Sequence, residues 1–344
     1  MRKLSLMLAM AAGLASTVMV PAGGVVPAAQ ADGRWGSAAR LDAPRAGLAV
    51  AVLEGRLYAA GGAGVTAPRV EFESYDAEID RWFPETPLPR GLERFGMAAV
   101  AGRIYVAGGY AVGGSVRGDG WSGDRWSDGQ TIGEQRVAPS ARMWSWSVEG
   151  GVWQSEVAMP APKADFDLVA LDDKLYAVGG QRDAGEIFVF DPDARSWDVM
   201  ATPEGITRSA AATIVFDGRI YVIGGFSAGR PLDRVDVFDP QSGEWTNGVA
   251  LPQPRGGLAV AGDGERIHVF GGRGADNTTL DLHTSWAPGE SGWRDEAALP
   301  SPRTNAAAAA LQGALYLVGG GSGGGFFSPF TAIDNTDIFR EDAS

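Results

Sequence analysis

Seven side chains at two recurring positions have the types needed to bind a polar or anionic small molecule. Each position is counted from a Gly-Gly doublet, lying directly after it or 14 residues before it. The seven are Arg94, Asp165, Asn305, Tyr110, Gln181, Phe226 and Arg273. Arginines pair with anions, carboxylates and amides form hydrogen bonds, and aromatic side chains stack on rings. The same residues can instead solvate a cleft and pair with one another.

A glycine-rich stretch, residues 110–139, carries a second group with binding chemistry. Trp121 and Trp126 lie among Asp119, Asp124 and Asp128. Tryptophan beside carboxylates can hold a sugar by ring stacking and hydrogen bonds. The aspartate spacing does not match a calcium-binding loop. A second interpretation stays open, in which both tryptophans pack on the rim of the fold, because tryptophan is usually partly buried.

Residue types that are missing or scarce exclude several kinds of chemistry. The sequence has no cysteine, which removes disulfides, thiolate nucleophiles and thiolate metal ligands. Two histidines, His268 and His283, are too few for a His-rich metal site. No Ser-His-Asp set or phosphate-binding loop is found. We therefore predict no metal and no cofactor, and the catalytic residues, if any exist, remain unknown.

The candidate residues belong to a unit that recurs six times. An apolar run ends in Gly-Gly at Gly62, Gly109, Gly180, Gly225, Gly272 and Gly320, with spacings of 47, 71, 45, 47 and 48 residues. A tryptophan follows at Trp82, Trp153, Trp197, Trp245 and Trp293. A basic residue stands 16 positions before most doublets, and we expect it to bond turn carbonyls and carboxylates between blades.

Each unit has the pattern of four short strands separated by Gly, Asp and Pro. A period of about 45–50 residues with four strands is typical of a β-propeller. We predict an all-β, six-bladed propeller over residues 32–344, with 110–139 as a long loop inserted in blade two. Antiparallel strand order places the second-to-third-strand loops and the links between blades on one face. The candidate residues and the insertion should therefore gather around one mouth of the channel.

The first unit is preceded by what has the pattern of a fourth strand. Trp35, Leu41 and Arg45 have the spacing found in the other fourth strands, whereas the sixth unit stops after its third strand near Arg340. We predict that the N-terminal strand completes the last blade and closes the ring, which leaves no unpaired edge between the first and last blades.

Residues 1–31 have the pattern of a signal peptide. Arg2 and Lys3 precede an apolar run, and Ala29-Gln30-Ala31 forms an A-x-A cleavage site. The alternative is a membrane anchor, but the run is shorter than the ~20 residues that a span needs. Cleavage after residue 31 predicts a periplasmic or extracellular protein that is not embedded in the membrane.

The charge of the mature chain restricts its partners. The full sequence has 29 basic and 42 acidic residues, a net charge of −13, and removing Arg2 and Lys3 makes it −15. Such an acidic chain repels nucleic acid and anionic membrane surfaces. We expect a monomer whose partner is another protein or a small polar or anionic ligand such as a sugar.

The repeated Gly-Gly doublet, the tyrosine three residues before it and the later tryptophan resemble the kelch repeat family. The resemblance covers residues 32–344 and implies a propeller with one repeat per blade, whose mouth positions line a ligand pocket. It implies a ligand- or protein-binding module as the leading function. The alternative is a carbohydrate-active enzyme similar to the periplasmic N-acetylneuraminate mutarotases, with Arg94, Arg273 and Asp165 in its site. A third interpretation is a structural partner in an exported assembly.

One branch of the resemblance is excluded by composition. Galactose oxidase is a copper enzyme on a kelch propeller, and its site uses histidines and a tyrosine crosslinked to cysteine. Because this chain has no cysteine, that copper radical chemistry is not expected here.

Overall fold

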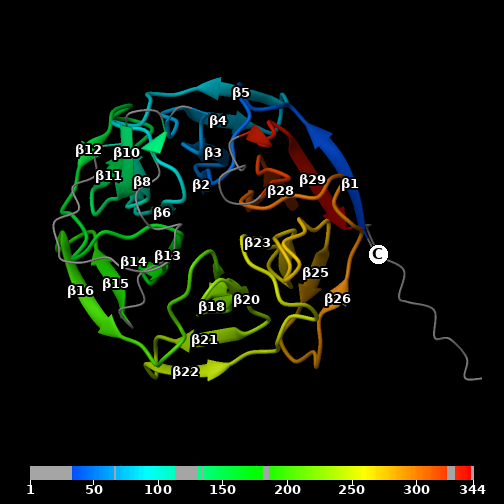
Figure 1. The fold of residues 1–344 in the computed structure, drawn as a ribbon. Helices are drawn as coiled ribbons and strands as arrows, with labels where there is room; N and C mark the ends of the chain where they lie inside the picture. The colour runs from blue at the N-terminus through cyan, green and yellow to red at the C-terminus, as the bar shows by residue number, and fades with distance from the viewer. Residues whose placement is uncertain are drawn as a thin grey trace, which may run out of the picture. The chain divides into compact units, whose positions relative to one another are not determined.

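The computed structural model describes residues 33–65, 67–112, 131–132, 135–180, 186–323 and 330–341. These residues form six four-stranded antiparallel sheets that stand as blades around a ring (Figure 1). The predicted all-β, six-bladed propeller is therefore confirmed. Within the same residues no helix has both the length and the apolar character that crossing a membrane requires.

Within each blade the first strand of the repeat is innermost and the fourth is outermost. Blades one to three consist of β2 (Ala49–Leu53), β3 (Arg56–Ala60), β4 (Phe72–Asp76) and β5 (Arg81–Pro84); β6 (Gly96–Val100), β7 (Arg103–Ala107), β11 (Met143–Trp146) and β12 (Gln154–Ser155); and β13 (Phe166–Leu171), β14 (Lys174–Gly179), β15 (Glu186–Asp191) and β16 (Ser196–Ala201).

Blades four to six follow the same plan. They consist of β17 (Ala212–Phe216), β18 (Arg219–Ile223), β21 (Val235–Asp239) and β22 (Glu244–Asn247); β23 (Ala259–Gly262), β24 (Ile267–Phe270), β25 (His283–Trp286) and β26 (Arg294–Asp295); and β27 (Ala307–Leu311), β28 (Ala314–Val318), β29 (Thr336–Glu341) and β1 (Gly33–Ala38). Loops of blades two and four add β8 (Tyr110–Val112), β9 (Thr131–Ile132), β10 (Gln135–Pro139), β19 (Phe226–Ser227) and β20 (Arg230–Pro231).

The predicted ring closure is confirmed by the pairing of the first strand with the last. In Figure 1 the blue β1 runs beside the red β29 at the outer edge of blade six. The two strands are antiparallel, with Trp35 opposite Phe339. Trp35 also donates its indole N–H to the carbonyl of Ala297 in blade five, at 2.9 Å. The closing strand is thus bonded to its own blade and to the neighbouring one.

The repeated tryptophans explain how neighbouring blades adhere. Each of five outer-strand tryptophans donates its indole N–H to a backbone carbonyl of the preceding blade, at 2.9–3.0 Å: Trp35, Trp82, Trp153, Trp197 and Trp293. Between the blades lie six apolar clusters, one at each interface around the ring. Burial of these side chains is the main force that holds the ring together.

The basic residue that precedes five of the six doublets is buried where one blade joins the next. Arg208 is representative, with a side chain that is 1% exposed. Its guanidinium donates to the carbonyl of Ile206 in the link between blades at 3.2 Å and to the carbonyl of Val222 in β18 at 2.8 Å. It also pairs with Asp236 at 2.6 Å. These contacts match the carbonyl and carboxylate partners that the repeat pattern predicted.

The inner hairpins show where blade five departs from the repeat. In the other five blades, the two residues that join the first and second strands both have positive φ, as type I′ turns require: Glu54-Gly55, Ala101-Gly102, Asp172-Asp173, Asp217-Gly218 and Gln312-Gly313. Blade five instead has Asp263 at the corner, and its carboxylate accepts from the N–H groups of Glu265 and Arg266 at 2.8 and 2.7 Å.

Candidate functional site

Six equivalent residues, one from each blade, form the rim at one end of the channel. Each lies just before the innermost strand of its blade, and all six have φ between +50° and +65°: Gly47, Arg94, Asp165, Ala210, Gly257 and Asn305. Left-handed backbone is uncommon for residues other than glycine. Its repetition at every blade indicates that one geometric requirement acts around the whole rim.

That requirement is a closed ring of backbone hydrogen bonds. Each rim residue donates its N–H to the carbonyl of the rim residue in the preceding blade, at 2.7–3.0 Å, and Gly47 completes the circle by donating to Asn305. The six blades are thereby joined at their inner corner independently of their side chains. We call this feature the rim ring, and it fixes where the mouth side chains begin.

Arg94, Asp165 and Tyr110 form one bonded network on the rim. The guanidinium of Arg94 lies 3.3 Å from Asp165 Oδ1, and the hydroxyl of Tyr110 donates to Asp165 Oδ2 at 3.2 Å. The side chain of Asp165 is only 4% exposed, whereas that of Arg94 is 24% exposed. The negative charge of Asp165 raises the pKa of Arg94 further above its usual range. Arg94 therefore stays charged while part of it faces solvent.

Arg273 and Phe226 form a second pair on the same rim. The guanidinium carbon of Arg273 lies 5.1 Å from the centre of the Phe226 ring, a cation–π contact. Burial lowers the pKa of Arg273, and the charge of Arg94 lowers it further. Two arginines thus lie close enough to repel each other, and only one of them is paired with Asp165.

The remaining predicted site residues divide into one that the structure places and three that it does not describe. Asn305 is a member of the rim ring, and its side chain lies against Gly257, where an added Cβ would come within 3.1 Å of Asn305 Oδ1. Gln181, Trp121 and Trp126 lie outside the described residues. The base of the blade-two insertion is described: β8 pairs with β10, which places Tyr110 opposite Pro139 beside the mouth.

Glu93 is a mouth residue that the sequence analysis missed. Its backbone pairs with that of Tyr110 through two hydrogen bonds of 2.9 and 3.1 Å. Burial raises the pKa of its carboxyl group, although the charge of Arg94 opposes that rise. Its position holds no other carboxylate in the repeat: the equivalents are Ala46, Ala164, Ser209, Gly256 and Thr304. This contrast with the other five blades is the feature of the sequence that marks Glu93 as a candidate site residue.

A second missed carboxylate, Asp167, lies below the rim in the channel. The channel has a volume of about 550 Å³ and is lined by the innermost strands of all six blades. The equivalent positions in the other five blades are small and apolar: Ala49, Gly96, Ala212, Ala259 and Ala307. Asp167 Oδ2 accepts from the N–H of Thr213 at 2.6 Å. Burial nevertheless raises the pKa of Asp167 to about 7.

Comparisons with known proteins agree with the repeat pattern. Residues 165–337 match the sequence profile of the KLHDC2/KLHL20/DRC7 Kelch-repeats domain. Kelch-like protein 35 of Mus musculus is 28% identical over 255 residues, which cover 72% of this chain and 38% of that protein. Kelch repeat and BTB domain-containing protein 13 of Homo sapiens is 32% identical over 181 residues, which cover 50% of this chain and 39% of that protein.

The chain spans about two fifths of the length of these curated relatives. Among solved structures, that of YjhT aligns with a TM-score of 0.70 at 15% identity, covering 86% of this chain and 95% of that chain. At this identity the likeness concerns the fold alone.

Proposed function

Because the chain belongs to the kelch-repeat family, we propose that it is a binding module whose mouth holds a small anionic ligand. The observation that carries the proposal is the pair of arginines on the rim. Arg94 is partly balanced by Asp165, whereas Arg273 contacts an aromatic ring and no carboxylate among the described residues. A carboxylate or phosphate at the mouth would supply the missing negative charge.

The charges of the described mouth residues favour binding of an anion, although the chain as a whole is acidic. Asp165 offsets one arginine, and burial favours the neutral form of Glu93. Among the mouth residues that the structure describes, this leaves an excess positive charge at Arg273. Charges within a partly buried cleft are screened less than those on an open surface, so the distant acidic residues matter less than these neighbours.

The aromatic residues of the mouth would have different roles in holding a ring-shaped ligand. Phe226 packs against Gly256 and under Arg273, so its main contribution is to position that guanidinium. Tyr110 stands at the base of the blade-two insertion, with its hydroxyl on Asp165. We infer that Trp121 and Trp126 of the insertion add stacking surface, in the manner of a sugar site.

A second candidate function rests on the two missed carboxylates. A sugar mutarotase needs groups that exchange protons near neutral pH, and efficient acid–base catalysts have a pKa close to the working pH. Glu93 has a raised pKa beside the proposed anion site, and the pKa of Asp167 is about 7. An enzyme that exchanges the anomers of an anionic sugar is therefore the alternative.

We also propose that the protein is exported and works in the periplasm or outside the cell. Support comes from the basic start, apolar run and A-x-A site of residues 1–31. N-terminal sequencing of the protein recovered outside the cytoplasm should begin at Asp32. Recovery of the full chain from the cytoplasm would contradict export without affecting the mouth proposal.

The binding proposal is tested by calorimetry with a panel of sugar acids, neutral sugars and sugar phosphates. An anionic member should bind, and Arg273→Ala should weaken that binding by about 2–5 kcal/mol, as expected when a buried charge pair loses one partner. The control is Arg219→Ala, which removes an exposed arginine of the blade-four hairpin, at the other end of the innermost strand from the rim. Binding unchanged in Arg94→Ala and Arg273→Ala would place the site elsewhere.

The same panel separates the alternatives. Anomer exchange by NMR that disappears in Glu93→Gln would establish the mutarotase. A panel without any binder would contradict the small-ligand proposal and favour a protein partner.

A further inference from the structure

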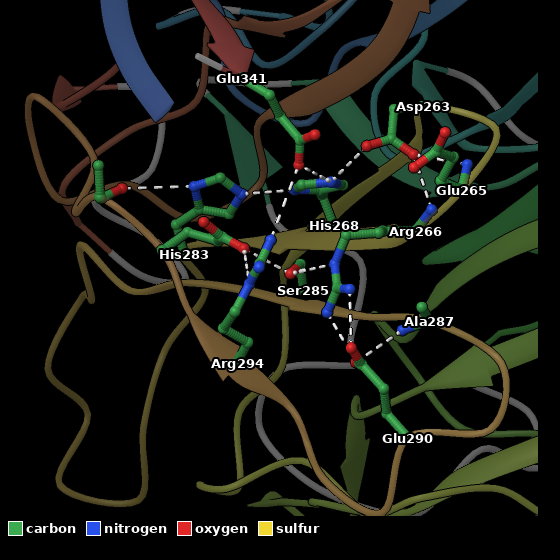
Figure 2. Close-up of polar contacts among 12 residues, drawn as sticks. Asp263, Glu265, Arg266, His268, His283, Ser285, Ala287, Glu290, Arg294 and Glu341 are labelled. Carbon is green, nitrogen blue, oxygen red and sulfur yellow. Dashed lines mark hydrogen bonds and ion pairs between the residues drawn. The ribbon is translucent and has the colours of Figure 1, made fainter. Parts of the chain in front are cut away.

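Blade five holds a buried pair of histidines connected to two carboxylates (Figure 2). His268 Nδ1 lies 2.9 Å from His283 Nε2, and His268 Nε2 lies 2.9 Å from Asp263 Oδ2. Glu341, at the end of β29 in blade six, places Oε1 3.9 Å from the same His268 nitrogen. We call Asp263, His268, His283 and Glu341 the seam cluster, because it spans blades five and six.

Comparison with the other five blades shows that three of these residues replace core positions together. The positions of Asp263, His268 and His283 are aligned by the strand pairing of each blade. Their equivalents are Leu53, Tyr58 and Phe72; Val100, Tyr105 and Met143; Leu171, Tyr176 and Ile187; Phe216, Tyr221 and Val235; and Leu311, Tyr316 and Thr336. The fold therefore does not need an imidazole or a carboxylate at these positions, and the joint change points to a separate role.

The hydrogen-bond chain fixes which nitrogen of each ring is available. The carbonyl of Ala297 can only accept, so His283 donates to it from Nδ1, at 3.3 Å. In this tautomer the Nε2 atom of His283 accepts, so His268 donates to it from Nδ1. These hydrogen bonds hold the Nε2 atom of His268 toward two carboxylate oxygens, one from Asp263 and one from Glu341.

The charges around the seam cluster leave room for a cation. The ion pairs in and beside it join four carboxylates, Asp263, Glu290, Glu296 and Glu341, to His268 and to two guanidinium groups, Arg266 and Arg294. These carboxylates and guanidinium groups sum to −2. In addition, Glu296 Oε2 is buried without a hydrogen-bond partner among the described residues. A divalent cation would bring the sum to zero.

We propose that Asp263, His268 and Glu341 form a binding site for a divalent transition metal ion, with Zn²⁺ as the best fit. Neighbouring ligands of a tetrahedral zinc ion lie about 3.4 Å apart, given bond lengths of ~2.0–2.2 Å. The three ligand atoms here all lie within 4.8 Å of one another. One imidazole and two carboxylates suit a first-row transition ion better than Ca²⁺ or Mg²⁺, which prefer oxygen ligands alone.

The surroundings meet the other requirements of such a site. The side chain of Asp263 is 20% exposed and that of Glu341 is 42% exposed, which gives an ion a path from solvent and leaves a position for water. His283 orients the imidazole ligand from behind, as the partners of metal-binding histidines usually do. Because Glu341 belongs to β29, a bound ion would connect blade five to the blade that closes the ring.

The test is calorimetric titration of the tag-free mature chain with ZnCl₂, together with its melting temperature with and without Zn²⁺. We expect one Zn²⁺ per chain and a melting temperature that rises by roughly 3–5 °C near saturation. Glu341→Gln changes an exposed ligand, so it should fold normally while binding Zn²⁺ more than about tenfold more weakly. The matched control is Asp217→Asn, an exposed carboxylate in the equivalent hairpin of blade four, which should bind as the parent does.

A second variant separates loss of the metal site from loss of the fold. The triple change Asp263→Leu, His268→Tyr and His283→Phe installs the residues of blade one, so it should remain folded and lose Zn²⁺ binding. Saturable binding that persists in this variant and in Glu341→Gln would place the metal elsewhere and overturn the proposal. A parent protein that does not bind Zn²⁺ at millimolar concentration would also overturn it, and His268 with Asp263 would then be a structural ion pair only.

Discussion

Arg94 and Asp165 are bonded to each other twice, once through the backbone and once through the side chains. The N–H of Asp165 donates to the carbonyl of Arg94 at 3.0 Å, and the guanidinium of Arg94 lies 3.3 Å from the Asp165 carboxylate. Two residues separated by 71 positions in the chain thus become neighbours because the ring brings their blades together.

This double contact predicts a measurable cost for Asp165→Asn. The change keeps a residue that tolerates left-handed backbone but removes the charge that Arg94 faces. We expect the free energy of unfolding to fall by about 1–3 kcal/mol, less than for a fully buried pair because Arg94 is partly exposed. Urea unfolding measures the effect. Asp172→Asn, in an exposed turn of the same blade, serves as the control and should be close to neutral.

The rim ring predicts opposite effects for two changes at Ala210. Its φ is +50°, a conformation that costs an L-residue about 1–2 kcal/mol. Valine is a strong outlier there, so Ala210→Val should lower the free energy of unfolding by about 1–3 kcal/mol. Ala210→Gly relieves strain and should be neutral or slightly stabilising. Ala201→Val, in an exposed strand position, should have little effect in the same urea experiment.

Ring closure can be tested at Trp35. Trp35→Phe removes the indole hydrogen bond to Ala297 and should lower the free energy of unfolding by about 1 kcal/mol. Trp35→Ala also removes the contacts with Phe270, His283 and Phe339, and should cost about 2–4 kcal/mol for this half-buried ring.

Deleting residues 33–44 removes the closing strand completely. We expect calorimetry to show the loss of the cooperative unfolding transition. A deletion variant that melts as sharply as the parent would contradict the role given to β1.

Asp167 predicts a pH dependence of stability. Burial raises the pKa of this carboxyl from 3.8 to about 7 in the folded protein. Between about pH 4 and pH 7 the folded state therefore binds a proton that the unfolded state has lost, so this contribution to stability decreases as pH rises. At about 1.36 kcal/mol per pKa unit, the parent should lose up to about 4 kcal/mol relative to Asp167→Asn across this range. Parallel stability profiles for the two proteins would contradict the raised pKa.

The fold could be predicted from the sequence because each blade repeats its own signals. Six Gly-Gly doublets set the number of blades, and the spacing from Trp35 to Arg45 identified the closing strand without a structural template. Strand pairing within a blade depends on residues close together in the chain, which is why a periodic pattern determines it.

The site could be predicted only in part, because it depends on contacts between blades. The positions of Arg94, Asp165 and Arg273 around the mouth followed from their place in the repeat. The choice between pairing and ligand binding did not, since it depends on side-chain distances across the ring. Glu93 lies one residue before a rim position and Asp167 two residues after one, outside the two positions per repeat from which the site was predicted.

The histidines illustrate the same limit. His268 stands in the place of the repeat tyrosine and is fully buried there. Its contact with His283 could not be foreseen, because the loop between β24 and β25 separates them and only the strand register places them at 2.9 Å. The signal in the sequence is that Asp263, His268 and His283 all depart from the repeat within the same blade.

The rim ring also bears on how this surface can change over time. Its six hydrogen bonds use only main-chain atoms, so the identity of the rim side chains contributes nothing to the circle itself. A change of side chain at one position therefore leaves the circle itself in place, provided that the new residue tolerates left-handed backbone. Arginine, aspartate, asparagine, alanine and glycine already occupy the six positions. Natural or engineered substitutions can therefore change the side chains presented at the mouth one blade at a time.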